Sequence, residues 1–487
     1  MLVTIGTVCR PIFPSRSPCH LIGGLLRRSI VIHSDSKRFS IVIATLSLGV
    51  LSLATALHAG LSFGSRGRTV GGVVIDPAGM VRAATIEDRQ ELANQLQNAN
   101  QVLQGDLRDA ADLRMISLKG LQAAISESHA TGKAIPAEVE YMAGLQRIEY
   151  VFVDQENHDV ILAGPAEPWE MREDGFVVGT VTGGATMRLA DLTVALRSVE
   201  NARQEGITCS IEPTDEGRRR LQQLLNRVKL RPGQSPVALE ASMREAFGPQ
   251  MIYLSGIPTD TRFARTLVAA DFEMKRVAMG LTPSPVATLP SYLEMTKNSQ
   301  QTKNQNPRWW MACSYDALGK SDDGLAWKLS GQGVQTKTEQ DIVNQDGSVK
   351  RGGVDKMAKA WADKMTESYD DLSKKMPVFS ELQNMMDLTV VATLIVQERL
   401  ADKAGLDLGV LGNENQALEL ASYTTPKAVE PHCSFIRGRA GWVVTASGGV
   451  DINGFEIVQK QTSDAISGQV RQEALAASTG NRWWWNK

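Results

Sequence analysis

Apolar and polar positions form their densest local pattern between Gln250 and Leu281. The run Met251 to Leu254 predicts a strand, and Gly256 with Pro258 ends it. Thr259 to Thr261 then offers side-chain oxygens that cap free backbone N–H groups at the start of a helix. Apolar side chains recur along that helix with the spacing of one buried face, at Phe263, Leu267, Ala270, Met274, Val277 and Leu281. The segment is therefore predicted to be a strand, a turn and an amphipathic helix.

The polar residues of this helix carry candidate chemistry. Helical periodicity places Asp271 at the edge of the buried face, one turn before Lys275. Three arginines fall together on the opposite side: Arg262, Arg265 and Arg276. We favour an Asp271–Lys275 pair on a packing helix with a solvent-exposed arginine stripe; a ligand site at the turn is the alternative. A phosphate ligand is disfavoured because the Asp260 carboxylate occupies the helix N-terminus and repels anions.

Strands and helices alternate around this segment. Ile207 to Ile211 predicts a strand and Thr214 to Val228 a helix, ahead of the strand at 250–255 and the helix at 260–279. This order is a βαβα unit. Further strands are expected at 147–153, 160–163, 441–446 and 450–458. The chain is therefore predicted to have an α+β fold, with mixed sheets and packed helices.

A second helix, Ser380 to Ala404, is predicted to lie at the centre of the fold. Its stretch Leu388 to Val396 is apolar nearly all round, which is typical of a helix buried on most sides. The stretch is too short to span a bilayer. Asn384 and Asp387 flank it and are expected to be buried polar groups that need partners.

The N-terminal region has the pattern of an export signal. Lys37 and Arg38 precede an apolar run from Ile41 to Leu57, and Ala54 to Ala56 offers small residues at the spacing that signal peptidase recognises. We expect an exported protein, periplasmic or secreted. The alternative is a protein anchored in the membrane by an uncleaved segment 41–57, because that length is at the lower limit for a spanning helix.

Composition divides the rest of the chain. Residues 284–306 are rich in proline, glutamine and asparagine, which favours a connection between two regions. The expected segments are a leader of doubtful status (1–36), a signal peptide (37–59), a linker (60–72), an N-terminal α+β domain (73–283), the connection (284–306), a C-terminal α+β region (307–460) and a polar tail ending in WWWNK (461–487).

Charge and residue counts exclude several functions. Without residues 1–59, 46 basic and 53 acidic residues remain, so nucleic-acid binding through a basic surface is disfavoured. Cys209, Cys313 and Cys433 have no metal-motif spacing, and the remaining histidines are scattered. We therefore expect no metal site and no cofactor.

Tryptophans are the candidate binding residues. Adjacent Trp309 and Trp310 point to opposite faces of a strand, so one is expected in the core and one exposed. Trp483, Trp484 and Trp485 lie at the chain end, where a short tail cannot bury them all. Exposed aromatic side chains are typical of contact with a lipid interface, a protein partner or a sugar.

Four sequence blocks resemble an uncharacterised exported bacterial family, known only as a domain of unknown function. The blocks are Leu162–Trp169 (LAGPAEPW), Cys209–Gly217 (CSIEPTDEG), Gly256–Arg265 (GIPTDTRFAR) with Asp271–Arg276 (DFEMKR), and Pro307–Trp310 (PRWW). The likeness covers roughly residues 75–460. The resemblance implies no activity, cofactor or catalytic residue.

Two functional hypotheses remain. The leading one is a non-enzymatic exported protein that binds a protein or polymer partner in the cell envelope, with membrane contact through the signal segment or the tryptophan tail. The alternative is an exported hydrolase-like enzyme that uses carboxylate chemistry, with Asp271, Arg262 and Cys209 brought together in a cleft.

Overall fold

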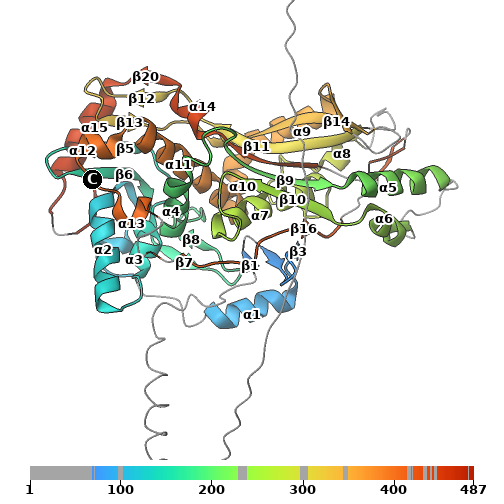
Figure 1. The fold of residues 1–487 in the computed structure, drawn as a ribbon, viewed down its shortest axis with the longest axis horizontal. Helices are drawn as coiled ribbons and strands as arrows, with labels where there is room; N and C mark the ends of the chain where they lie inside the picture. The colour runs from blue at the N-terminus through green and yellow to red at the C-terminus, as the bar shows by residue number, and fades with distance from the viewer. Residues whose placement is uncertain are drawn as a thin grey trace, which may run out of the picture. The chain divides into compact units, whose positions relative to one another are not determined.

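Ten strands form the larger of the two main sheets in the part of the chain that the structure describes (Figure 1). In this computed structural model the described residues are 69–70, 72–96, 103–228, 239–296, 305–343, 349–413, 418, 420–431, 436–438, 441–443, 447–480 and 482–487. In spatial order the strands are β1 (Thr69–Val70), β2 (Val73–Ile75), β3 (Met80–Ala83), β16 (Ala428–Val429), β10 (Gln250–Ser255), β9 (Ile207–Pro213), β19 (Ser447–Ile452), β11 (Gln305–Ser314), β14 (Gly333–Val343) and β15 (Val349–Gly352). The sheet is mixed, because β19 pairs in parallel with β11, and β16 with β3.

Strand β19 is a central strand, antiparallel to β9 and parallel to β11. Two glycines make this fit possible. A Cβ on Gly448 would lie 1.7 Å from the backbone oxygen of Trp309, and one on Gly449 would lie 2.0 Å from that of Cys209. A larger residue would therefore force the neighbouring backbones apart.

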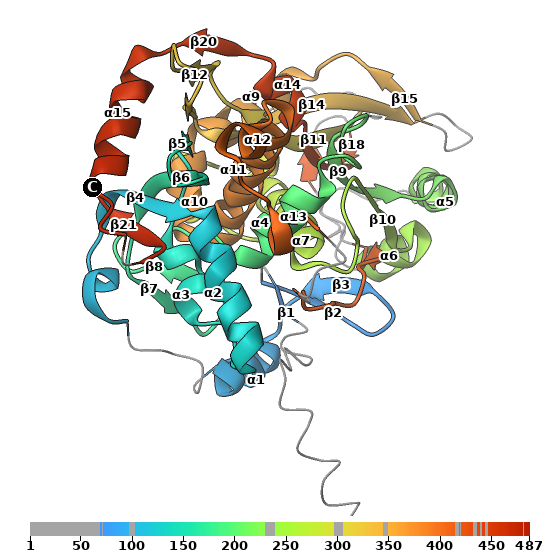
Figure 2. The same cartoon turned by 60° about the vertical axis from the view of Figure 1, so that its left-hand side comes forward.

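Seven strands form the second main sheet. In spatial order they are β20 (Gln461–Ser463), β12 (Leu318–Lys320), β13 (Ala326–Lys328), β5 (Tyr150–Asp154), β6 (Asp159–Ala166), β4 (Ala111–Ser117) and β21 (Trp484–Asn486). Figure 2 shows the C-terminal segment running from β20 through the helix α15 (Ala465–Ala476) to β21. The segment 461–487, expected to be a polar tail, thus supplies both edge strands of this sheet. Two separate hairpins are β7 (Trp169–Met171) with β8 (Val177–Gly179), and β17 (Ile436–Gly438) with β18 (Gly441–Val443).

Helices pack against these sheets and against each other. Besides α15, they are α1 (Ile86–Leu96), α2 (Leu118–Thr131), α3 (Ala137–Glu140), α4 (Leu189–Ser198), α5 (Asp215–Arg227), α6 (Glu240–Phe247), α7 (Arg262–Ala278), α8 (Tyr292–Thr296), α9 (Lys356–Glu367), α10 (Tyr369–Lys375), α11 (Pro377–Gln397), α12 (Leu400–Ala404), α13 (Gly409–Gly412) and α14 (Gly454–Val458), with 3₁₀ turns at Gly105–Arg108 and Met142–Gly144. None of these described helices combines the length and apolar character that a membrane span requires. The predicted α+β fold with mixed sheets and packed helices is confirmed.

Local signals explain several helix boundaries. The Thr261 hydroxyl accepts the Ala264 N–H and caps α7, as its sequence predicts. The helix expected at 380–404 is two helices, because Arg399 adopts a left-handed backbone (φ 54°) between α11 and α12. The strand expected over 450–458 ends at Ile452, since the Asn453 side chain accepts the Glu456 N–H and starts α14.

The large sheet takes strands from both of the regions that composition separates. Strands β9 and β10 come from the predicted domain 73–283, whereas β11, β14 and β19 come from 307–460. The two-domain division stays a prediction. The predicted leader (1–36), the signal peptide (37–59) and most of the linker lie outside the described residues.

Replacement of Gly449 tests the insertion of β19. Gly449→Ala is expected to lower the free energy of unfolding by roughly 3 kcal/mol, because its Cβ meets β9 backbone. Urea denaturation followed by circular dichroism measures the loss. The control is Gly353→Ala, since a Cβ there has nothing within 4 Å. Equal stability of both variants would contradict the close strand contact.

Candidate functional site

The central helix α11 buries two carboxylates, and each is neutralised inside the protein. Arg147 donates to Asp387 through Nε (2.6 Å) and Nη2 (3.0 Å), and the Tyr315 hydroxyl donates to the same carboxylate at 2.6 Å. Burial lowers the pKa of Arg147, but the interaction with Asp387 raises it by more. The net effect is a raised pKa for Arg147. Burial, with the charge of Asp387, raises the pKa of Tyr315 well above its usual value. Asp387 and Asn384 are buried as expected, and Asn384 Nδ2 donates to the Ala185 carbonyl at 3.0 Å.

Arg262 neutralises the second carboxylate of α11. Its guanidinium donates to Asp191 on α4 and to Glu381 on α11, and all three residues are buried. Arg188 adds a longer contact of 3.9 Å to Glu381. Burial raises the pKa of Asp191, while Arg262 opposes that shift. This cluster links three segments that are distant in sequence.

The expected solvent-exposed arginine stripe is therefore wrong. Arg262 is 8% exposed and Arg265 only 2%, with its guanidinium 5.0 Å from the centre of the Tyr423 ring. Arg276 is half-buried beside Glu273 at 3.6 Å. Helical periodicity distinguishes an apolar face of α7 from a polar one. It cannot predict that α4 and α11 pack against the polar face.

The structure pairs Asp271 with Lys275, as favoured, and buries both. Lys275 Nζ lies 2.8 Å from Asp271 Oδ2 and also donates to the Ile211 carbonyl of β9 at 3.1 Å. Asp271 Oδ1 makes no hydrogen bond within the described part of the chain. Cys209 lies close enough for Asp271 to affect its pKa, which burial, the larger cause, raises well above the usual value. Asp271 of α7 and Cys209 of β9 lie on two elements that pack together, whereas Arg262 belongs to the separate cluster with Asp191.

The candidate tryptophans divide into buried and half-buried side chains. Trp309 is fully buried, with its Nε1 donating to the Ala358 carbonyl at 3.1 Å, and Trp310 on the other face of β11 is half-buried. Trp484 and Trp485 lie in β21 and are 5% and 6% exposed, so the expectation of exposed aromatic rings fails for both. Trp483 is half-buried. A binding role for any of the five stays a prediction.

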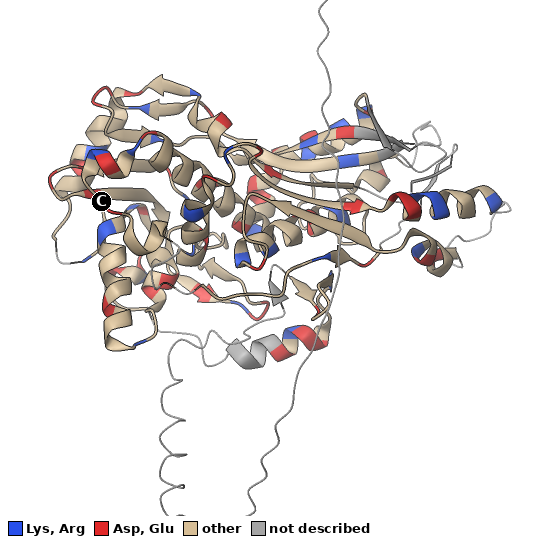
Figure 3. Ribbon diagram, in the orientation of Figure 1, with Lys and Arg blue, Asp and Glu red and all other residues tan. Residues whose placement is uncertain are grey.

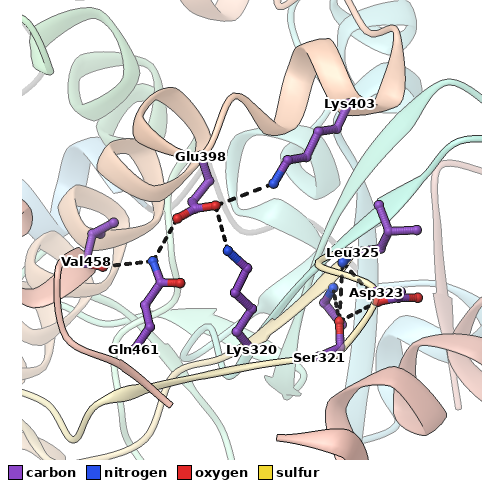
Figure 4. Close-up of polar contacts among 9 residues, drawn as sticks. Lys320, Ser321, Asp323, Leu325, Glu398, Lys403, Val458 and Gln461 are labelled. Carbon is purple, nitrogen blue, oxygen red and sulfur yellow. Dashed lines mark hydrogen bonds and ion pairs between the residues drawn. The ribbon is translucent and has the colours of Figure 1, made fainter. Parts of the chain in front are cut away.

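A third carboxylate follows the end of α11. Figure 4 shows Glu398 accepting hydrogen bonds from Lys320 at 2.9 Å, Gln461 at 2.8 Å and Lys403 at 3.4 Å. Burial opposes ionisation, but the bonds from Gln461 and Lys320 outweigh it and lower the pKa of Glu398. Both lysines also lie over the Trp327 ring, at 5.4 Å and 4.8 Å from its centre. These hydrogen bonds to Glu398 connect β12, α12 and β20 to the end of α11.

Polar side chains converge on a cavity beside the turn that follows β10. The cavity has a volume of about 330 Å³. It is lined by Glu200, Asn201, Arg203, Gln204, Glu205, Gly206, Ser255 and Gly256. Gly256 needs its positive φ of 82° here, and a Cβ on it would meet the Gly206 carbonyl at 2.5 Å. The turn predicted from the sequence to present a ligand site therefore does border a polar cavity.

A second cavity of about 120 Å³ opens at the same edge of the ten-stranded sheet. It is lined by Ala312, Cys313, Ser314, Tyr315, Gln335, Lys337, Asp451, Asn453, Glu456, Ile457 and Lys460. Burial raises the pKa of Asp451 although Lys337 opposes the shift, whereas the hydrogen bond from Lys460 lowers that of Glu456. Tyr315 lines this cavity and donates its hydroxyl hydrogen bond to Asp387 of α11.

The two cavities are neighbours. β10, β11 and β19 end at this edge, where β9 and β14 begin. Arg203 of the first cavity stacks over the ring of Phe455, which lies in α14 beside Glu456 of the second, at 4.9 Å. We call this edge, with its two cavities, the sheet-edge site. The sheet-edge site has positively charged, negatively charged and neutral hydrogen-bonding side chains, which suits binding of a polar ligand.

Part of the chain matches a known protein family. Residues 209–292 match the family described as "Protein of unknown function (DUF1598)". The matched range runs from β9 to the start of α8 and contains the blocks at 209–217 and 256–276. The blocks at 162–169 and 307–310 lie outside it. The comparisons with curated proteins and with solved structures found no match. An uncharacterised family is thus supported, and no activity follows from it.

Sequence reasoning missed most of the sheet-edge site. Glu200 to Gly206 is a polar turn after α4, and no local spacing marks it as part of a site. Asp451 and Glu456 belong to a segment expected to be one strand. Only the turn at Gly256 carried a signal, namely a strand that ends before a capped helix.

Removal of Arg262 tests the buried cluster. Arg262→Leu is expected to lower the free energy of unfolding by about 3–5 kcal/mol, because Asp191 and Glu381 stay buried without their partner. Arg172→Leu, which removes a more exposed pair with Asp174, should cost at most about 1 kcal/mol. Denaturant unfolding measures both losses, and a small loss for Arg262→Leu would contradict the cluster.

Thiol labelling tests the environment of the cysteines. At pH 8, iodoacetamide should leave Cys209 and Cys313 of the folded protein unmodified, because burial raises the pKa of Cys209 well above its usual value and that of Cys313 to about 12. Both thiols stay protonated below those values, and both should react in urea. Peptide mass spectrometry assigns each label. Fast labelling of Cys209 in the folded protein would instead support the hydrolase alternative.

Proposed function

We propose that the protein is a non-enzymatic, exported binding protein that holds a polar partner of the cell envelope at its sheet-edge site. One observation carries the proposal. Polar side chains from distant segments line two neighbouring cavities at this edge. The candidate catalytic groups Asp271, Arg262 and Cys209 are instead buried.

Burial weighs against catalysis by these three residues. Asp271 is 0% exposed, and the amine of Lys275 occupies one of its oxygens. Arg262 is occupied by two carboxylates. A protonated thiol is a poor nucleophile, and burial keeps Cys209 protonated near neutral pH. A carboxylate mechanism would need a cleft that brings Arg262 to Asp271, and Arg262 is held in another cluster.

Export is supported by the sequence. A basic pair precedes the apolar run 41–57, and small residues stand near its end at 54–56. Arginines and carboxylates both occur along the described helices, with the acidic residues of α5 in its first turn and arginines after them (Figure 3). Such mixed charge favours a specific polar partner over general adsorption to a polyanion.

Cell fractionation of the full chain in a bacterial host tests the proposal. The wild type should appear in the envelope fraction, and Leu48→Arg with Leu51→Arg should keep the protein in the cytosol, because charges interrupt the apolar run. Glu205→Lys, at the exposed rim of the first cavity, should still be exported but shift into the soluble exported fraction.

Glu170→Lys is the matched control, since it makes the same charge change at an exposed position outside both cavities. It should fractionate like the wild type. If the arginine variant is still exported, the signal is wrong. If Glu205→Lys and Glu170→Lys behave alike, binding at the sheet-edge site is wrong.

A further inference from the structure

The ten-stranded sheet has one face turned to the core and one turned away from it. Cys209 of β9 and Trp309 of β11 point to the core, where α7 and α9 pack against them. Side chains alternate along a strand, so their neighbours Ser210 and Trp310 point the other way. We call this second side the outer face.

Strand register aligns residues of the outer face in a row. Tyr253 pairs with Ser210, Ser210 with Gly449, Gly449 with Trp310, and Trp310 with Lys337. Tyr253 is 59% exposed, Lys337 is exposed, and Ser210 and Trp310 are half-buried. Two aromatic side chains therefore lie on strands that are three spacings apart, about 14 Å, with only small residues between them.

A second row runs beside the first and joins the sheet-edge site. It consists of Ser255, Thr208, Asp451, Ala312 and Gln335, again paired strand by strand. Ser255 lines the first cavity, and the last three residues line the second. The hydroxyls of Thr208 and Ser255 lie 2.7 Å apart. Hydrogen-bonding groups thus lie along one side of the aromatic row.

Both signs of charge occur on the outer face, where Arg308 also has Glu339 of β14 as its register partner. On the far side of the aromatic row, Arg308 of β11 pairs with Glu212 of β9 at 3.1 Å. Lys337, at the end of the aromatic row, and Asp451, in the second row, both line the second cavity. A polyanion would meet Asp451 and Glu212, and a lipid surface would need a continuous apolar patch. This mixture of charges favours a neutral ligand over a polyanion.

Neutral sugars combine the two properties that this face matches. A pyranose ring has an apolar C–H face that packs on Tyr or Trp, and hydroxyls at its edge that bond to hydroxyl, amide and carboxylate groups. We propose that the outer face binds an extended neutral polysaccharide strand across Tyr253 and Trp310, with its hydroxyl edge along the row from Ser255 to Gln335. This inference rests on the proposed binding function and names the ligand class.

Isothermal titration calorimetry on the full chain tests the proposal, with cellohexaose and chitohexaose as neutral probes and heparin as a polyanion. At least one hexaose should bind, and the two probes distinguish a plain glucan from an N-acetylated strand. Tyr253→Ala and Trp310→Ala should each bind that hexaose roughly tenfold more weakly. Trp310→Phe keeps an aromatic face and should retain most of the affinity.

Tyr150→Ala is the control, because it removes a half-buried aromatic side chain from the seven-stranded sheet, outside the proposed face. It should bind like the wild type. Binding of neither hexaose, tighter binding of heparin, or equal affinities for Tyr253→Ala and wild type would each overturn the proposal. If Glu205→Lys still releases the protein from the envelope while no hexaose binds, only the sugar assignment fails.

Discussion

The burial of α11 is the constraint on which the rest of the structure depends. A helix covered on every side cannot leave a carboxylate unpaired, because an isolated buried charge costs several kcal/mol. Glu381 and Asp387 therefore each recruit an arginine from a distant segment, Arg262 and Arg147. These pairs contribute little net stability as such. They fix the position of α11 against α7 and against the strand that follows Arg147, so they select one packing arrangement.

The insertion of β19 is a second constraint, and it creates the candidate site. The strand fits between β9 and β11 only because glycine stands at Gly448 and Gly449. Once it is in place, the ends of β10, β11 and β19 meet the turn before β9 at one edge. Segments that are hundreds of residues apart in the chain then share two cavities and a common outer face. A site of this kind suits recognition of an extended ligand, because several strands contribute to it side by side.

The function that we propose follows from which ionisable groups are buried and which reach the surface. Inside the fold, the ionisable groups that suggested chemistry neutralise one another, and Lys275 with Asp271 is the clearest example. At the sheet edge and on the outer face, polar groups of both charges reach the surface. Two aromatic side chains, Tyr253 and Trp310, stand among them. That combination is typical of specific binding to an uncharged, hydroxyl-rich partner.

Features that depend on neighbours along the chain could be predicted from the sequence. The α+β fold, the strand and capped helix at 250–281, the buried α11 and the Asp271–Lys275 pair follow from periodicity and capping over a few turns. Which face of α7 is covered depends on the packing of distant segments, so Arg262, predicted to face solvent, lies in a buried cluster. Tertiary structure also buries Trp484 and Trp485 by pairing β21 with β4. Except for the turn at Gly256, the sheet-edge site could not be predicted either, because strand order and register join distant segments whose local sequences do not reveal the pairing.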